Sequence, residues 1–343
     1  MEDDVKKVLI TGGMGFVGQH LLKILLEKYK GIQILILDKR KPSFFIQSLD
    51  QSKQIEIVDN IDLLDIGSMD KYFEKVDYVI HVAALISFWR KDKKALYDVN
   101  INGTQNVIDL CKKHNIKRLV YVSSTASIGF NNKKEELTTE EFKYDWKKGR
   151  GFHYMLSKHY AEERVKVAAK EGLNAVIANP SSMFGPGDKK FFPLADMVNS
   201  DKVPGMLPGG FSITDVRDTA NALAILLEKG KAGDNYLIIG GNYTYKEMFT
   251  QLALKLKAPL PTKQIPRIAG YVLVPLISFV ELLLPKPIKL TREVLSPGFK
   301  YRYYSNEKAK RELGWEPNYT LEHTFKDAIE FYTNYQKGIE VIS

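Results

Sequence analysis

The 343-residue sequence predicts an α/β fold, in which a doubly wound parallel sheet is followed by a smaller C-terminal domain. Short, continuous apolar runs recur along the first half of the chain, and each is typical of a strand that is buried on both faces. Stretches with apolar residues at helical spacing separate these runs, as they do when helices cover both faces of a parallel sheet. After residue 180 the alternation is lost and glycine and proline become frequent, which indicates a second, less regular unit.

The elements can be placed on the chain from this pattern. In the first half, strands are expected at residues 8–10, 32–37, 55–58, 78–82, 119–122 and 173–178, and helices at 17–29, 68–75, 94–114 and 153–171. In the second half, strands are expected at 211–216 and 236–239, and helices at 218–228, 244–257 and 319–336. We therefore assign residues 1–180 to the first domain and residues 181–343 mainly to a substrate-binding domain, with segments near 211–240 returning to the first sheet.

Composition indicates a cytoplasmic globular protein. Apolar residues make up 44% of the chain and charged residues 27%, which is ordinary for this class. Cys111 is the single cysteine, so an internal disulfide is excluded and neither an oxidising compartment nor a metal site is expected. The acidic start at residues 1–4 is unlike a secretory signal. The formal charge is +9, but basic and acidic residues are interleaved, so we expect a solvated surface and no nucleic-acid partner.

Residues 268–285 form a nearly continuous apolar segment. Pro275 interrupts it and Glu281 lies within it, whereas a spanning helix needs about 20 apolar residues with few charges. A buried or cleft-covering helix is the preferred interpretation. Peripheral contact with a membrane surface is the alternative.

A glycine-rich turn lies between the first expected strand and the first expected helix. Residues 11–18, TGGMGFVG, place Gly12, Gly15 and Gly18 in a G-x-x-G-x-x-G pattern. Glycines permit a tight turn and a close approach of the backbone to a pyrophosphate, and the helix N-terminus supplies amide donors. Because strand, turn and helix occur in the required order, the motif predicts a dinucleotide-binding, Rossmann-type domain.

Two acidic residues are expected to bind the adenosine part of the dinucleotide. Asp38 ends the second strand, 20 residues after Gly18, where a carboxylate can accept hydrogen bonds from the ribose hydroxyls and so favours NAD. Lys39 and Arg40 follow at once and could hold a 2′-phosphate instead, so NADP remains open. Asp62 follows the third strand and could hold the adenine amino group, or be a plain surface residue.

Tyr154 and Lys158 are candidates for acid–base chemistry. They are four residues apart in an expected helix and therefore share one face. A free tyrosine titrates near pH ~10, and a neighbouring ammonium group favours the phenolate. Ser124 follows the fifth strand, at the edge where ligands bind in doubly wound sheets, and could hydrogen-bond the same substrate oxygen. A Tyr-x-x-x-Lys pair alone is common, and this one gains weight from its place after the nucleotide-binding strands.

Taken together, these motifs resemble the extended short-chain dehydrogenase/reductases of the NAD-dependent epimerase/dehydratase family. The resemblance runs from residue 7 to about 335 and also includes HVAA at 81–84, NINGTQN at 100–106, NPSSMFGPGD at 179–188, DVRDTANA at 215–222 and ELGWEP at 312–317. It implies Ser124, Tyr154 and Lys158 as the catalytic triad. It also implies that residues 81–84 line the cofactor, that Asn100 ties the fourth-strand region to the neighbouring helix, and that residues 180–183 touch the nicotinamide.

Motifs and resemblance together give one expected set of cofactor-binding residues. They are Gly12, Gly15, Phe16, Val17, Asp38, Asp62, Leu63, Ala83, Ala84, Asn100, Tyr154, Lys158, Pro180 and Met183.

Within that class, the chain looks most like bacterial dihydroflavonol-4-reductase-like and 3β-hydroxysteroid dehydrogenase-like proteins. Nucleotide-sugar epimerases usually carry a late Arg-x-Gly-Asp-like element, and here the nearest candidate is Arg292, without Gly-Asp. Phe88 and Trp89 are candidates for stacking on a substrate, and equally for packing.

Three functions are therefore weighed. The first is an NAD(P)-dependent oxidoreductase that transfers hydride to or from a hydrophobic or ring-type alcohol or ketone, with Tyr154 as acid/base. The alternative is a nucleotide-sugar epimerase or dehydratase that retains its NAD. The third is a non-catalytic dinucleotide sensor, which is disfavoured because serine, tyrosine and lysine are all present. By analogy with the class, a homodimer through helices 94–114 and 153–171 is also expected.

Overall fold

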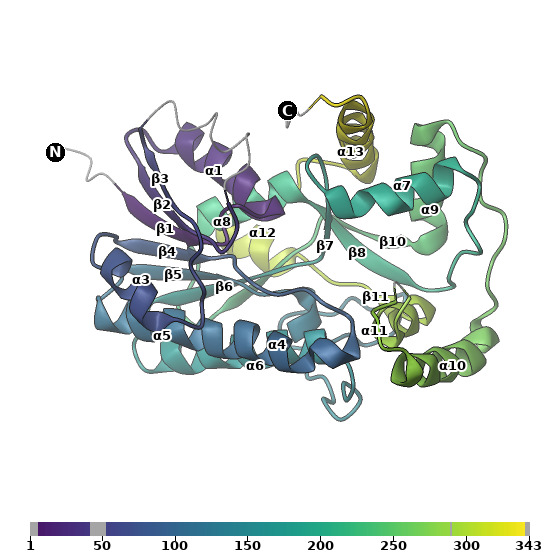
Figure 1. The fold of residues 1–343 in the computed structure, drawn as a ribbon, viewed down its shortest axis with the longest axis horizontal. Coiled ribbons are helices and arrows are strands. Elements are labelled where there is room, and N and C mark those ends of the chain that lie inside the picture. Colours follow the sequence, from purple (N-terminus) through teal and green to yellow (C-terminus); the bar gives the residue numbers. More distant parts are fainter. Residues whose placement is uncertain (1–5, 42–52, 289, 340–343) are drawn as a thin grey trace.

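A computed structural model describes residues 6–41, 53–288 and 290–339 (Figure 1). The acidic start that argues against a secretory signal lies outside the described residues.

The first domain is built on a seven-stranded sheet in which every strand pair is parallel. Its strands are β1 (Lys7–Thr11), β2 (Gln33–Leu37), β3 (Ile55–Val58), β4 (Tyr78–His81), β5 (Arg118–Val122), β6 (Ala175–Pro180) and β9 (Asn235–Ile238). The order is β3-β2-β1-β4-β5-β6-β9, so the direction of strand addition reverses between β1 and β4. The predicted doubly wound parallel sheet is confirmed, and ligands bind such sheets at this reversal point.

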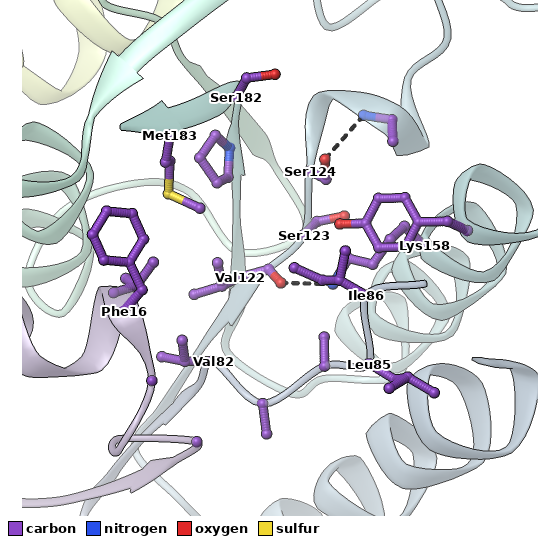
Figure 2. Close-up of a pocket in the computed structure, with 18 of the residues that line it drawn as sticks. Phe16, Val82, Leu85, Ile86, Val122, Ser123, Ser124, Lys158, Ser182 and Met183 are labelled. Carbon is purple, nitrogen blue, oxygen red and sulfur yellow. Dashed lines mark hydrogen bonds between the residues drawn. The ribbon is translucent and has the colours of Figure 1, made fainter. Parts of the chain in front are cut away.

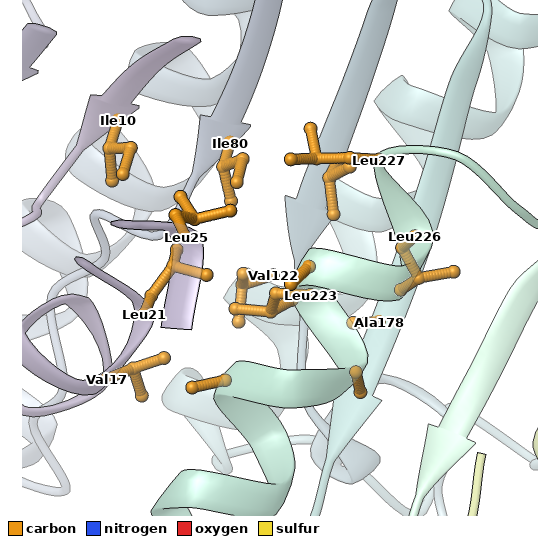
Figure 3. Close-up of a cluster of buried hydrophobic side chains, with 14 of the residues drawn as sticks. Ile10, Val17, Leu21, Leu25, Ile80, Val122, Ala178, Leu223, Leu226 and Leu227 are labelled. Atoms are coloured by element: carbon orange, nitrogen blue, oxygen red, sulfur yellow. The ribbon is translucent and has the colours of Figure 1, made fainter. Parts of the chain in front are cut away.

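Helices cover both faces of this sheet (Figure 1). One face carries α1 (Phe16–Lys28), α8 (Val216–Leu226) and α12 (Glu307–Leu313), and the other carries α3 (Ile66–Phe73), α5 (Gly103–Lys113) and α6 (His153–Lys170). Side chains alternate along each strand: Val8 and Ile10 pack under α1 and α8, whereas Leu9 packs on the α3, α5 and α6 side. Figure 3 shows the first of these cores, which fixes the start of α1 against the sheet.

The expected helix at residues 94–114 is in fact three segments. The short helix α4 (Lys93–Tyr97) runs into a π-helical turn (Asp98–Asn102), which leads into α5. The turn contains Asn100, whose side chain is buried and bonds to backbone outside the helix. Such turns are rare and often occur near functional sites, and apolar periodicity alone does not reveal them.

The second domain is centred on β8 (Gly210–Asp215). This strand pairs with β7 (Ser182–Phe184), β10 (Gly241–Thr244) and β11 (Tyr301–Arg302). Helices α7 (Phe192–Asn199), α9 (Tyr245–Leu256) and α13 (Leu321–Gln336) pack on this sheet around one apolar core. Of the segment expected to return to the first sheet, α8 and β9 lie on or in it, whereas β8 belongs to the second sheet.

The apolar segment near residue 270 folds as α10 (Gly270–Leu283), followed by α11 (Arg292–Leu295). The expected burial of this segment is wrong: Glu281 is the buried residue of α10, and most of its large apolar side chains face solvent. The expectation of a cleft-covering helix agrees with Pro275, Phe279 and Leu282, which line a small cavity. The helix lies at one end of the molecule beside α11 (Figure 1). Across the described ranges, no helix is long and apolar enough to cross a membrane.

Candidate active site

A cavity of about 1190 Å³ opens at the carboxyl ends of β1, β4, β5 and β6. The second domain closes its other side through residues that include Glu293, Lys300 and Arg302. Most of the predicted site residues line this one cavity: Gly12, Gly15, Phe16, Val17, Asp38, Asp62, Leu63, Ala83, Ala84, Ser124, Tyr154, Lys158, Pro180 and Met183.

Two glycines of the first turn have no room for a side chain. Gly12 has φ +74°, and a Cβ there would lie 2.7 Å from the backbone of Ala83. A Cβ on Gly18 would lie 2.3 Å from the carbonyl oxygen of Gly13. The turn is therefore closed against β4 on one side and against helix α1 on the other, which leaves its backbone bare toward the cavity.

The N-terminus of α1 is suited to an anionic ligand. Gly15 is its N-cap, no side chain caps it, and its first turn holds no acidic residue. By contrast, Asp215 caps α8 and Thr244 caps α9. The first N–H groups of a helix need acceptors, and together with the helix dipole they favour a phosphate. The residues present thus fit the pyrophosphate of a dinucleotide.

The acidic residues at the far end of the cavity are already paired. Asp38 accepts hydrogen bonds from the Met14 N–H at 2.9 Å and from Arg40, whose guanidinium lies 3.0–3.1 Å from its two oxygens. Lys39 donates to Asp62 at 2.7 Å, and this ammonium group lowers the pKa of Asp62. The residues predicted to distinguish NAD from NADP therefore all border the cavity. They are the carboxylate Asp38 and the cations Lys39 and Arg40, and Asp62 borders the cavity with them.

Tyr154, Lys158 and Ser124 all line this cavity, and Figure 2 shows Ser124 and Lys158 on the same side of it. Tyr154 and Lys158 project from α6, one helical turn apart. The Lys158 ammonium donates to the Val122 carbonyl at 2.9 Å and lies 4.7 Å from the centre of the Tyr121 ring. Ser124 follows β5, and its hydroxyl accepts the Ala126 N–H at 3.2 Å. Met183 and Phe16 stand opposite this group (Figure 2).

Burial controls the ionisation of this pair. It raises the pKa of Tyr154 to about 12, while a hydrogen bond with Ser124 acts in the opposite direction. Burial lowers the pKa of Lys158 to about 7, against the nearby Glu162 carboxylate. In the protein alone, loss of hydration is the largest influence on the Tyr154 pKa and keeps the phenol protonated, so activation of the phenol by the ammonium group stays a prediction.

A buried polar network supports Ser124 from below. Glu162 is 1% exposed, and it accepts hydrogen bonds from Ser123 at 2.7 Å, from Asn179 at 2.7 Å and from Ser127. Lys166 pairs with the same carboxylate at 2.8 Å. Asn179 also donates to the Ser124 carbonyl. A satisfied network of this kind fixes the position of the loop that follows β5.

Glu293 is a site residue that the sequence reasoning missed. Its carboxylate accepts the backbone N–H groups of His153, Tyr154 and Met155 at 2.9–3.2 Å. A carboxylate from the second domain thereby caps the first turn of α6, where no side chain of α6 itself does so. Glu293 is next to Arg292 in the sequence, but its partner His153 lies 140 positions away in the chain, so no local pattern indicates the contact.

Four other candidates lie away from the cavity wall. His81 is fully buried between Thr11 and Thr104, at 2.6 and 3.0 Å. Asn100 bonds both backbone groups of Leu85 and the Ser157 hydroxyl, so it shapes the wall without lining it. Trp89 is buried by packing, whereas Phe88 lines the cavity with its ring 5.4 Å from that of Tyr154. Arg292 lies over the Phe152 ring, outside the main cavity.

Comparison with known protein families shows which family the chain belongs to. The model of the 3-beta hydroxysteroid dehydrogenase/isomerase family matches residues 9–207. The chain belongs to this family. The predicted class, an enzyme of the extended short-chain dehydrogenase/reductase type, is thereby confirmed.

Individual relatives agree with the family over most of the chain. A putative dihydroflavonol 4-reductase from Synechocystis is 29% identical over 338 residues, covering 95% of this chain and 94% of the relative. Sterol demethylase protein B from Methylococcus capsulatus is 28% identical over 267 residues, covering 75% and 77%. A 2-alkyl-3-oxoalkanoate reductase from Stenotrophomonas maltophilia is 29% identical over 336 residues, covering 92% and 96%.

Solved structures share the whole fold. The crystal structure of gox2253 superposes with a TM-score of 0.82 at 26% identity, covering 98% of this chain and 100% of the other. The dTDP-glucose 4,6-dehydratase from Bacillus anthracis in complex with NAD superposes with a TM-score of 0.75 at 21% identity, covering 98% and 99%. The second similarity is evidence for the fold alone.

Proposed function

We propose that the protein is an NAD-dependent oxidoreductase that interconverts a hydroxyl and a carbonyl group on a hydrophobic, ring-type substrate. One observation carries the proposal: Ser124, Tyr154 and Lys158 line the same cavity as the uncapped N-terminus of α1. A nicotinamide dinucleotide would supply or accept the hydride there. The chain itself has to provide proton transfer, orientation and exclusion of water.

Tyr154 is the proposed proton donor and acceptor at the substrate oxygen. Its pKa of about 12 keeps the phenol protonated at neutral pH, which suits donation to a ketone during reduction. Ser124 would hold the same oxygen by a second hydrogen bond. Lys158, with a pKa of about 7, can carry or release a proton within the ordinary pH range and so connect the phenol to the interior.

The substrate side of the cavity favours an apolar ring. It is lined by Ile86, Phe88, Phe130 and Phe152 of the first domain and by Pro297 of the second. The names of two relatives refer to dihydroflavonol and to sterols, and the name of the family refers to hydroxysteroids, which agrees with such a wall.

NAD is the proposed cofactor, held by the predicted set of residues other than Asn100. The support is Asp38, a carboxylate that is 6% exposed at the cavity edge and would repel a 2′-phosphate. Arg40 is the residue that could reverse this choice, since its guanidinium lies on Asp38. Separate titrations with NADH and NADPH decide the matter, and Arg40→Ala should weaken NADPH binding selectively if NADP is the true cofactor.

The nucleotide-sugar alternative has one observation in its favour. Lys189, Lys190, Lys300 and Arg302 all line the cavity and could meet a diphosphate. An epimerase or dehydratase of this kind returns the hydride to its substrate, so NAD would remain bound through purification.

The homodimer stays a prediction. Helix α6 exposes Tyr160 and Val167, but within the described residues α4 and α5 contribute no exposed large apolar side chain.

The direct test is turnover of the purified protein on lipophilic ring alcohols and on UDP-sugars, followed by nicotinamide absorbance. We expect net NADH formation on an alcohol, with freely exchanging cofactor. Conversion of a UDP-sugar with retained NAD and without net NADH would instead establish the alternative.

A further inference from the structure

Helix α10 presents a continuous apolar surface to solvent. Seven side chains on or next to it are 52–84% exposed and form what we call the α10 ridge: Ile268, Tyr271, Val272, Leu276, Phe279, Leu282 and Leu283. Their spacing of three and four residues places them along one side of the helix. The buried Glu281 points the other way, where its carboxylate accepts the Arg292 N–H at 2.8 Å. Contiguous exposed apolar surface of this kind marks an interaction site.

The charges around the ridge are of one sign. Lys263, Arg267 and Lys286 flank it in sequence and are exposed, and Lys91 reaches it by donating to the Leu284 carbonyl at 2.9 Å. Glu281 is the only acidic residue between positions 263 and 290, and it is turned inward. An apolar stripe bordered by cations is complementary to an anionic lipid surface.

A second cavity lies between the ridge and the active site. It has a volume of about 370 Å³. Pro275, Phe279 and Leu282 of α10 line it, together with the polar residues Arg90, His153, Ser278, Glu281 and Arg292. Phe88 and Glu293 line both this cavity and the main one. Phe88 packs edge-on against Tyr154, and Glu293 caps the helix that carries it. One layer of side chains therefore separates the α10 ridge from the catalytic cavity.

We propose that the α10 ridge seats the protein on the surface of an anionic bilayer, and that the cavity behind it admits a lipophilic substrate from the lipid to Tyr154. The delivery step rests on the proposed function, whereas the seating does not. Pairing of two ridges between copies of this chain is disfavoured, because a two-fold interface would bring the same cations of both copies together.

Co-sedimentation with vesicles tests the seating. The full-length protein should bind vesicles of phosphatidylglycerol and phosphatidylcholine, and bind phosphatidylcholine alone more weakly. Val272→Asp combined with Leu276→Asp should lower partitioning by more than about tenfold, since two apolar side chains are lost from the lipid contact. Lys263→Gln or Lys286→Gln should each lower it by about fivefold on anionic vesicles only.

A matched control uses exposed residues of the same types elsewhere. Val167 on α6 and Leu254 on α9 are 49% and 55% exposed, so Val167→Asp with Leu254→Asp should leave vesicle binding unchanged. The seating is refuted if the wild type does not bind anionic vesicles, or if both double variants lose binding equally. It is also refuted if the wild type is a dimer without vesicle affinity and the only effect of the ridge substitutions is to convert that dimer into monomers.

Turnover separates the delivery step from the proposed function. The ridge variant should raise KM for a ring alcohol dissolved in vesicles by about tenfold, and leave kcat and KM unchanged for the same alcohol solubilised in cyclodextrin. Vesicle binding without any alcohol oxidation would refute the proposed function and leave the seating intact. Equal loss of turnover in both formats would refute delivery through α10.

Discussion

At the scale of single residues, the site depends on one carboxylate from the second domain. Glu293 satisfies three backbone N–H groups at the start of α6, and one of them belongs to Tyr154 itself. A negatively charged group at the N-terminus of a helix also interacts favourably with the positive end of the helix dipole. Because α6 carries both Tyr154 and Lys158, we expect Glu293 to act as a positioning residue for the proposed catalytic pair.

Glu293→Gln should separate this role from simple packing. The amide keeps one acceptor but turns an N–H toward backbone donors, so we expect a loss of about 1–3 kcal/mol in the free energy of unfolding. We also expect a fall in kcat with little change in cofactor affinity. Chemical denaturation and steady-state kinetics measure both, and unaltered kcat with lowered stability would leave Glu293 a structural residue only.

The same variant carries a prediction about pH. Burial raises the pKa of Glu293 to about 7, above the value of ~4.3 expected in an unfolded chain. The folded protein therefore holds this proton over a range where the unfolded chain has released it, and the stability it contributes declines as the pH rises through about 7. The difference in unfolding free energy between wild type and Glu293→Gln should shrink between roughly pH 5 and pH 8. A difference that grows with pH would contradict this ionisation.

At the scale of elements, the glycine turn and the start of α1 form the phosphate cradle. The turn is fixed by close approaches of backbone to backbone, so its shape does not depend on flexible side chains. The steric cost of adding a methyl group at Gly12 can be separated from the cost of backbone strain, because Gly338 has the same φ of +74°.

Gly12→Ala should abolish dinucleotide binding and destabilise the fold. Its Cβ would lie 2.7 Å from the Ala83 backbone, in addition to the strain of φ +74°. Gly338 also has φ +74° but nothing within 4 Å of its Cβ, so Gly338→Ala reports the strain alone, about 1–2 kcal/mol. NADH titration and thermal unfolding of both variants measure the losses of cofactor affinity and of stability. Equal losses in Gly12→Ala and Gly338→Ala would contradict the prediction.

The elements also show what sequence reasoning can and cannot reach. Strands β1 to β6, helices α1 and α6, and the turn between residues 11 and 18 were predictable because their signals are local: apolar periodicity, glycine spacing, and residues one helical turn apart. The short strands β7, β10 and β11 were missed because so few residues, most of them polar in β10, give no apolar period. The exposure of α10 was predicted wrongly, because an apolar run does not say whether the chain itself will cover it.

The candidate site divides in the same way. Gly12, Asp38, Ser124 and Tyr154 belong to local motifs, and the structure brings these four predicted residues to one cavity. Glu293 was not, since its role exists only after the second domain packs on α6. The ionisation of Lys158 also escaped, because it is set by burial in the folded core and not by its neighbours in the chain.

At the scale of the whole molecule, the two domains divide the work around one cavity. The first supplies the glycine turn, the helix with the proposed catalytic pair and most of the apolar wall, and the second supplies Pro297 of that wall, the cap on α6 and the exposed ridge of α10. Any substrate that enters behind α10 passes Phe88 and Glu293 before it reaches Tyr154. Substrate access and catalytic positioning therefore share one interface between the domains.

The account rests on the Tyr154 hydroxyl acting beside a dinucleotide in this cavity. The most direct measurement is Tyr154→Phe, assayed for NADH affinity and for turnover of the best alcohol found for the wild type. We expect an unchanged dissociation constant for NADH and a loss of kcat of about 10²–10⁴-fold. Turnover that survives at the wild-type rate while NADH still binds would contradict the account.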